Sequence, residues 1–102
     1  MADLVVLYWR DMPSQVIARA GRKAAKQELP KRFMEAIDAA AMRAGATDTD
    51  AYLAGWRRGD PSPCGDDLEK AVADTVKEID RTYDSVRLQR LVAGGGKEAA
   101  GG

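Results

Sequence analysis

Apolar residues recur at helical spacing in the middle of the chain, and this pattern predicts two consecutive helices within residues 29–59. The first should begin at Pro30, which suits a first helical turn because its missing N–H would have no partner there. It should end near Ala44, because Gly45 can adopt the left-handed conformation that follows a helix. The residues that share its apolar face are Phe33, Ile37, Ala40, Ala41 and Ala44.

The second predicted helix starts where Thr47 and Asp50 have the spacing of a capping box. Its apolar stripe consists of Tyr52, Leu53 and Trp56, and the cations Arg57 and Arg58 suit the negative end of a helix. Gly59 and Pro61 then close it. We expect Trp56 to be the central residue of the core.

The N-terminal region has a different pattern, which predicts an antiparallel β-hairpin. Residues 4–9 (LVVLYW) form a continuous apolar run, typical of a strand buried on both faces. Residues 10–14 supply turn chemistry, and residues 15–20 alternate as a second strand would. A helix that starts at Pro13 is the alternative for this segment. In the strand interpretation Gly21 marks a bulge, with cations on an exposed edge beyond it.

The last third of the chain predicts a long helix. Residues 60–65 (DPSPCG) should form an irregular loop, because prolines and turn residues disfavour regular structure. Asp66 or Asp67 then caps a third helix, which should pack over the first two. Its apolar face consists of Leu68, Val72, Val76, Ile79 and Tyr83.

Two interpretations remain open after this helix. Asp84 and Ser85 could cap a short final helix over residues 86–92, or the long helix could continue. The glycine-rich segment 93–102 has too little apolar surface to order itself, so we expect a disordered tail. The predicted fold is therefore α+β: a single domain over residues 1–92, in which an N-terminal hairpin packs with three main helices.

Composition limits the class of protein. The chain has 102 residues, 45% of them apolar and 31% charged, which suits one domain with its own core. No apolar run is long enough to cross a membrane, and the N-terminus lacks the basic start of a signal peptide. We therefore expect a cytoplasmic protein. Cys64 is the single cysteine, so an internal disulfide is impossible.

Charge is balanced overall but unevenly distributed. Residues 1–34 contain seven Lys or Arg and three Asp or Glu, whereas the rest contains nine and thirteen. This asymmetry predicts either two layers of the protein that attract each other or a basic surface for an acidic protein partner. The candidate interaction residues are Arg10, Arg19, Arg22, Lys23, Lys26 and Arg32. Nucleic-acid binding through these cations, Lys31 and the aromatics Tyr8 or Trp9 is an alternative that overall neutrality disfavours.

Residues with catalytic or metal-binding chemistry are sparse. Histidine is absent, which removes the commonest general base and metal ligand. Asp48 and Asp50 imitate the start of a calcium loop, but the required later Gly and Glu are missing. Lys97 follows a glycine without the hydroxyl residue of a phosphate loop, and Cys64 has no histidine as a partner base. We therefore predict no catalytic residue, cofactor or metal.

Three segments carry a family resemblance: YWRDMPSQV, GRKAAK and EAIDAAAMRAG. They are similar to the bacterial "virulence factor" family, whose domain also occurs at the C-terminus of conserved virulence factor C, and the likeness extends over about residues 3–92. The resemblance implies a bacterial cytoplasmic domain. Because the sequence offers no catalytic residues, we expect a non-enzymatic accessory or interaction domain. Standalone members look similar to accessory proteins found beside folate and corrinoid one-carbon genes, so an accessory role in methyl transfer is a second implied function. Cys64 and the glycine-rich tail lie outside the shared segments.

Overall fold

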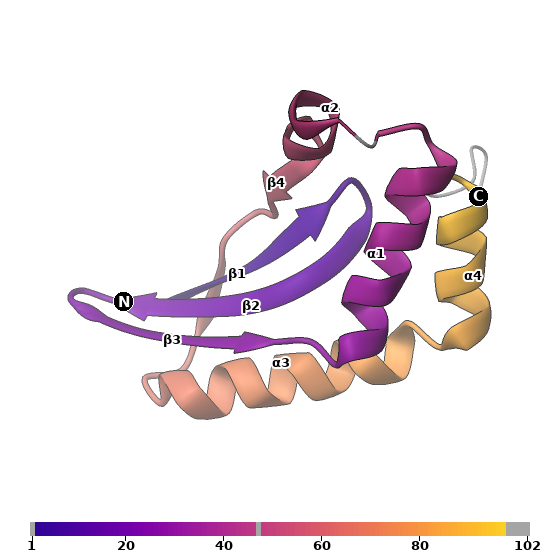
Figure 1. Cartoon of the computed structure of the whole chain (residues 1–102). Coiled ribbons are helices and arrows are strands. Elements are labelled where there is room, and N and C mark those ends of the chain that lie inside the picture. Colours follow the sequence, from indigo (N-terminus) through magenta and orange to yellow (C-terminus); the bar gives the residue numbers. More distant parts are fainter. Residues whose placement is uncertain (1, 47, 98–102) are drawn as a thin grey trace.

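The computed structural model describes residues 2–46 and 48–97 as an antiparallel sheet with helices packed against it (Figure 1). The α+β class predicted from the sequence is confirmed. In chain order the elements are β1 (Ala2–Trp9), β2 (Met12–Ala20), β3 (Lys23–Glu28), α1 (Lys31–Arg43), α2 (Thr49–Ala54), β4 (Trp56–Arg58), β5 (Ser62–Cys64), α3 (Leu68–Thr82) and α4 (Ser85–Ala93).

The sheet has the strand order β3-β2-β1-β4, and β5 pairs with the first half of β1 beside β4. All pairings are antiparallel, which confirms the predicted hairpin and rejects the alternative helix from Pro13. The sequence predicted a bulge at Gly21, but this residue is the first central residue of the β2–β3 turn. Its φ of 59° is costly for other residues, and it matches a two-residue hairpin turn. The prediction missed β3 because its alanine and lysine residues favour helices.

The strand β1 is not buried on both faces. Leu4 and Val6 pair with Ala18 and Val16 on the face that enters the core, whereas Val5 on the other face is partly exposed. The prediction was wrong because a continuous apolar run fits both a buried strand and one that has a partly open apolar face.

The predicted second helix ends earlier than expected, because α2 stops at Ala54 and residues 56–58 form β4 instead. Trp56 pairs with Trp9 across the sheet, so this segment satisfies the edge of β1. The α2 cap is Asp48, whose side chain accepts a hydrogen bond from the Ala51 amide at 2.9 Å. The predicted capping residue Thr47 lies outside the described residues. A six-residue helix has few internal hydrogen bonds, so tertiary pairing decides the boundary.

The central aromatic residue of the core is Trp9, not Trp56. Trp9 is fully buried, its indole Nε1 donates to the Tyr52 carbonyl at 2.8 Å, and the two rings stack. Trp56 is only partly buried at the rim, edge-on to Tyr52. The predicted loop 60–65 was also wrong, because three of its residues pair with β1 as β5.

The helices pack differently from the prediction. The bounds and buried face of α1 agree with the prediction. Asp67, one of the two predicted capping residues, caps α3. However, α3 packs against β2 and β3 instead of over the first two helices (Figure 1). A separate α4 begins after Asp84, which caps it, and this helix packs against α1. The chain therefore takes the first of the two interpretations left open after α3.

The start of the predicted tail contacts the β1–β2 turn. The amide of Asp11 donates to the Gly96 carbonyl at 2.8 Å, and the Gly96 amide donates to the Leu91 carbonyl at 2.7 Å. Residues 98–102 lie outside the described part of the chain, so the expectation for them stays a prediction.

Candidate interaction surface

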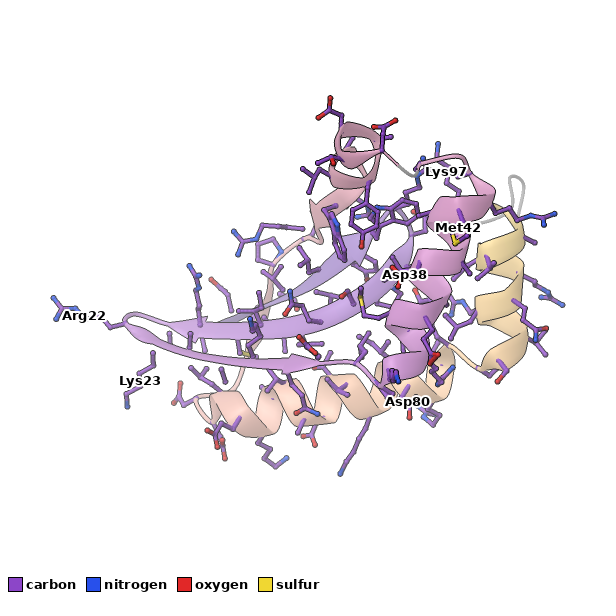
Figure 2. The ribbon with its side chains drawn as sticks, viewed as in Figure 1. Arg22, Lys23, Asp38, Met42, Asp80 and Lys97 are labelled. Carbon is purple, nitrogen blue, oxygen red and sulfur yellow. The ribbon has the colours of Figure 1, made fainter. Side chains whose placement is uncertain are left out.

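The structure distributes the six candidate cations over three separate places. Arg10 lies at the β1–β2 turn and Arg32 at the start of α1. Arg22 and Lys23 lie at the far end of the molecule, at the tip of the β2–β3 hairpin, and point away from it (Figure 2). Arg19 and Lys26 project from neighbouring strands between these ends. The six candidate cations therefore do not form one continuous strip.

Arg32 holds helices together. Its guanidinium forms an ion pair with Asp80 on α3 at 2.7 Å and donates to the carbonyls of Asp80 and Tyr83, both at 2.8 Å. It also stacks over the Phe33 ring, 4.5 Å from the centroid. Backbone carbonyls and a carboxylate accept the hydrogen bonds of this guanidinium, so its contacts join the start of α1 to the end of α3.

Arg10 holds the turn between β1 and β2. Its φ of 55° is in the left-handed region, which costs a non-glycine residue about 1–2 kcal/mol. Its amide donates to the Gly55 carbonyl at 2.7 Å, and its guanidinium donates to the Gly95 carbonyl at 2.8 Å. The guanidinium also lies 4.8 Å from the centroid of the Trp9 ring. These contacts compensate the strained backbone and connect the turn with α2 and the segment after α4.

The remaining cations border a partly exposed face of the sheet. Residues that pair directly across antiparallel strands project to the same side. Val5 pairs with Ile17, and Ile17 pairs on its other side with Lys26. We call this surface the open face; its aliphatic and cationic residues are Val5, Leu7, Ile17, Arg19, Lys26 and Arg58. The same pairing places Asp3 beside Arg19 and Glu28 beside Gln15 on this side.

Arg58 is the member of the open face that sequence reasoning missed. It pairs with Leu7 through β4, and β4 was predicted as the end of a helix. In a strand the successive residues Arg57 and Arg58 project to opposite sides, so only one of them reaches this face. No local signal distinguishes that arrangement from two arginines at a helix end.

A shallow depression of about 280 Å³ lies in the open face. Val5 and Ile17 form part of its floor, and Arg19 and Arg58 line it together with Asp3, Gly59 and Pro61. A Cβ at Gly59 would lie 2.9 Å from the Tyr8 ring, so glycine is required where the chain leaves β4. The depression thus combines apolar surface with two guanidinium groups and the carboxylate of Asp3.

The ion pairs of the described residues do not use the cations of the open face. Arg32, Arg57, Lys70 and Arg81 form ion pairs with carboxylates elsewhere in the described residues. Arg19, Lys26 and Arg58 are exposed and take part in none of these ion pairs, although Asp3 is the cross-strand partner of Arg19. Guanidinium groups match carboxylates and phosphates through paired hydrogen bonds.

The clear shifts in pKa occur away from the open face. Partial burial raises the pKa of the Tyr52 hydroxyl, and the negative charge of Asp38 adds to this effect. A hydrogen bond from Arg81 lowers the pKa of Glu78, and one to Asp74 raises the pKa of Lys70. The last two pairs lie along the exposed surface of α3, where such pairs contribute little stability.

The other chemical candidates have structural positions. Cys64 is half-buried on β5 beside the core, and Asp48 caps α2. Lys97 ends the described segment that packs against the β1–β2 turn. No group of three Cys, Asp or Glu side chains in the described ranges could hold a metal ion.

A membrane-spanning helix is not found among the described residues, where each helix is too short or too polar. Comparisons of the chain with curated proteins and with solved structures found no match. A family model described as "Virulence factor" matches residues 7–92, which extend from the second half of β1 to the end of α4. Because this match covers most of the chain, the protein belongs to the Virulence factor family.

Proposed function

We propose that this domain binds an acidic protein partner through the open face of its sheet. The observation that carries the proposal is the arrangement of three partly exposed aliphatic side chains between cations that have no ion pair within the described chain. In the candidate strip, Arg19 and Lys26 belong to this surface, whereas Arg22 and Lys23 line a separate depression beside the start of α3.

The size and lining of the depression indicate which kind of side chain the partner would insert into it. A side chain of moderate size, such as Leu or Met, fits a volume of about 280 Å³ that has an aliphatic floor. Acidic residues on either side of that side chain would reach Arg19 and Arg58. Apolar contact then supplies affinity, and the charges supply selectivity and a faster association. The expected motif is an apolar residue between acidic ones.

The experiment is an affinity capture from the native cell with the whole chain as bait, carried out with and without nuclease treatment. Arg19→Glu combined with Arg58→Glu should lose the captured protein. The matched control, Lys77→Glu combined with Arg90→Glu, changes the charge equally at exposed positions on α3 and α4 and should retain it. Capture should also weaken with added salt, because the open-face charges are exposed.

A separate variant tests the apolar part. Ile17→Gln keeps the charges and replaces the floor of the depression with a polar group, so capture should weaken while its salt dependence remains. Equal capture by the wild type and the open-face double variant would contradict the proposal. Loss of all captured material on nuclease treatment would favour nucleic-acid binding instead. Capture of a methyltransferase would support the alternative function, an accessory role in one-carbon transfer.

A further inference from the structure

The strand β3 ends the sheet on one side, and its outer edge has no strand beside it in the described chain. Five of its six residues are exposed, and only Ala25 is partly buried. The opposite side of the sheet ends in β4 and β5, which have three residues each. β3 therefore offers the longest free edge, and such edges pair readily with another strand.

The pairing with β2 determines which backbone groups of β3 point toward β2 and which point outward. The amide of Leu29 donates to the Ser14 carbonyl at 3.0 Å, in the same register that pairs Gln27 with Val16. Because backbone groups alternate in direction along a strand, the residues of β3 that direct their amide and carbonyl groups outward are Ala24, Lys26 and Glu28.

We propose that β3 pairs with β3 of a second copy of this chain, in the antiparallel register that places Ala25 opposite Ala25. A two-fold axis perpendicular to the sheet requires one residue to face its own copy, since paired side chains must project to the same side. Only a few registers satisfy this condition, and charge and backbone hydrogen bonding distinguish among them.

Charge favours two of these registers, and charge together with backbone hydrogen bonding favours the one centred on Ala25. The register centred on Ala25 brings Arg22, the turn residue just before β3, level with Glu28 of the other copy, twice, and places Lys26 opposite Ala24. Opposite charges in cross-strand positions stabilise a sheet, and like charges destabilise it.

The neighbouring registers are worse. A register centred on Lys26 would place that lysine opposite itself, and one centred on Ala24 would place Arg22 opposite Lys26. A register centred on Gln27 would pair Lys26 with Glu28 twice, which charge also favours, but it would place Ala24 opposite Pro30, which has no amide to donate. Like charges and Pro30 together therefore favour the register centred on Ala25.

The helices leave space for this pairing. α3 packs against both β2 and β3. Strands lie about 4.8 Å apart, so the two copies of α3 would lie about 10 Å apart, which is a usual distance between packed helices. Near the axis the acidic start of α3 lines a depression that also contains Lys23, so its charge is partly compensated within each copy. The dimer would join two open faces into one sheet surface.

The first test is the mass of the wild-type chain in solution over a range of concentrations, by analytical ultracentrifugation. We expect the mass to rise from 11.0 kDa to twice that value. Lys26→Pro removes an outward amide without affecting a bond to β2, so it should remain monomeric with unchanged circular dichroism. This test uses no partner protein, so its outcome is independent of the proposed function.

The second test exchanges the charges of the predicted pair. Arg22→Glu alone and Glu28→Arg alone each create two like-charge contacts and should weaken dimerisation about tenfold. The combined variant restores opposite charges and should return to the wild-type dissociation constant. Arg90→Glu on α4 is the control and should not change it.

Three results would overturn the inference. A wild-type chain that stays monomeric at about 1 mM contradicts dimerisation itself. A Lys26→Pro variant that is folded and dimeric contradicts pairing through the edge. A combined charge exchange as weak as its single variants contradicts the register.

Discussion

The two ends of the sheet contain the same type of residue in opposite roles. At the end where β1 turns into β2, Arg10 donates to a backbone carbonyl and stacks on Trp9. At the other end, Arg22 projects from the hairpin tip (Figure 2), and Arg19 lines an open depression. The difference shows that a cation becomes structural where helices and carbonyls surround it. It remains a candidate for binding where the sheet is open.

The largest expected effect concerns the two tryptophans near the β1–β2 turn. Trp9→Ala should lower the free energy of unfolding by about 3–5 kcal/mol, because Trp9 is fully buried beneath α2 and the segment after α4. Trp56→Ala should cost about 1–2 kcal/mol, because Trp56 is only partly buried. Urea denaturation of both variants measures the difference. A greater loss at Trp56 would mean that the core has been assigned to the wrong ring.

A smaller effect separates the structural cations from those of the open face. Arg32→Ala should cost about 1 kcal/mol, since the variant loses bonds to Asp80 and Tyr83 that are partly exposed to solvent. Arg19→Ala should change stability by less than about 0.5 kcal/mol. The same denaturation experiment tests both. Equal losses would remove the distinction between the two ends.

Arg10 sharpens the comparison, because its side chain stabilises a turn that its backbone strains. Arg10→Ala loses the contacts with Gly95 and Trp9 and keeps the strain, whereas Arg10→Gly loses the contacts and relieves the strain. The glycine variant should therefore be more stable than the alanine variant by about 1 kcal/mol. Thermal melting of the two variants compares them directly. A less stable glycine variant would show that the left-handed backbone carries no cost here.

The smallest expected effect is a loss of stability at high pH from Tyr52 in the same turn region. The folded-state pKa of Tyr52 lies above its usual value of 10.0, chiefly because of burial. The unfolded chain therefore releases this proton at lower pH than the folded chain, and stability should fall as pH rises above about 10. Tyr52→Phe should lose less stability than the wild type over that range in a pH series of melting temperatures. Parallel curves for the two proteins would exclude Tyr52 as the cause.

Much of the fold was predictable because local chemistry decided it. The hairpin followed from an apolar run and a turn, α1 from its spacing and Gly45, and α3 from Asp67 and its apolar face. Caps, glycine positions and periodicity act within a few residues, so their signals are present in the sequence itself. The family assignment followed from segments of the same kind.

Tertiary structure alone decided the rest. Residues 56–58 and 62–64 became strands because β1 had an unpaired edge to fill, and residues 23–28 did so beside β2. These pairings join positions far apart in sequence, so short segments show no local pattern for them. The roles of the cations depend on the same packing. Charge is a property of the residue itself. Whether a cation forms hydrogen bonds and ion pairs within the protein depends on which carbonyls and carboxylates the fold brings beside it.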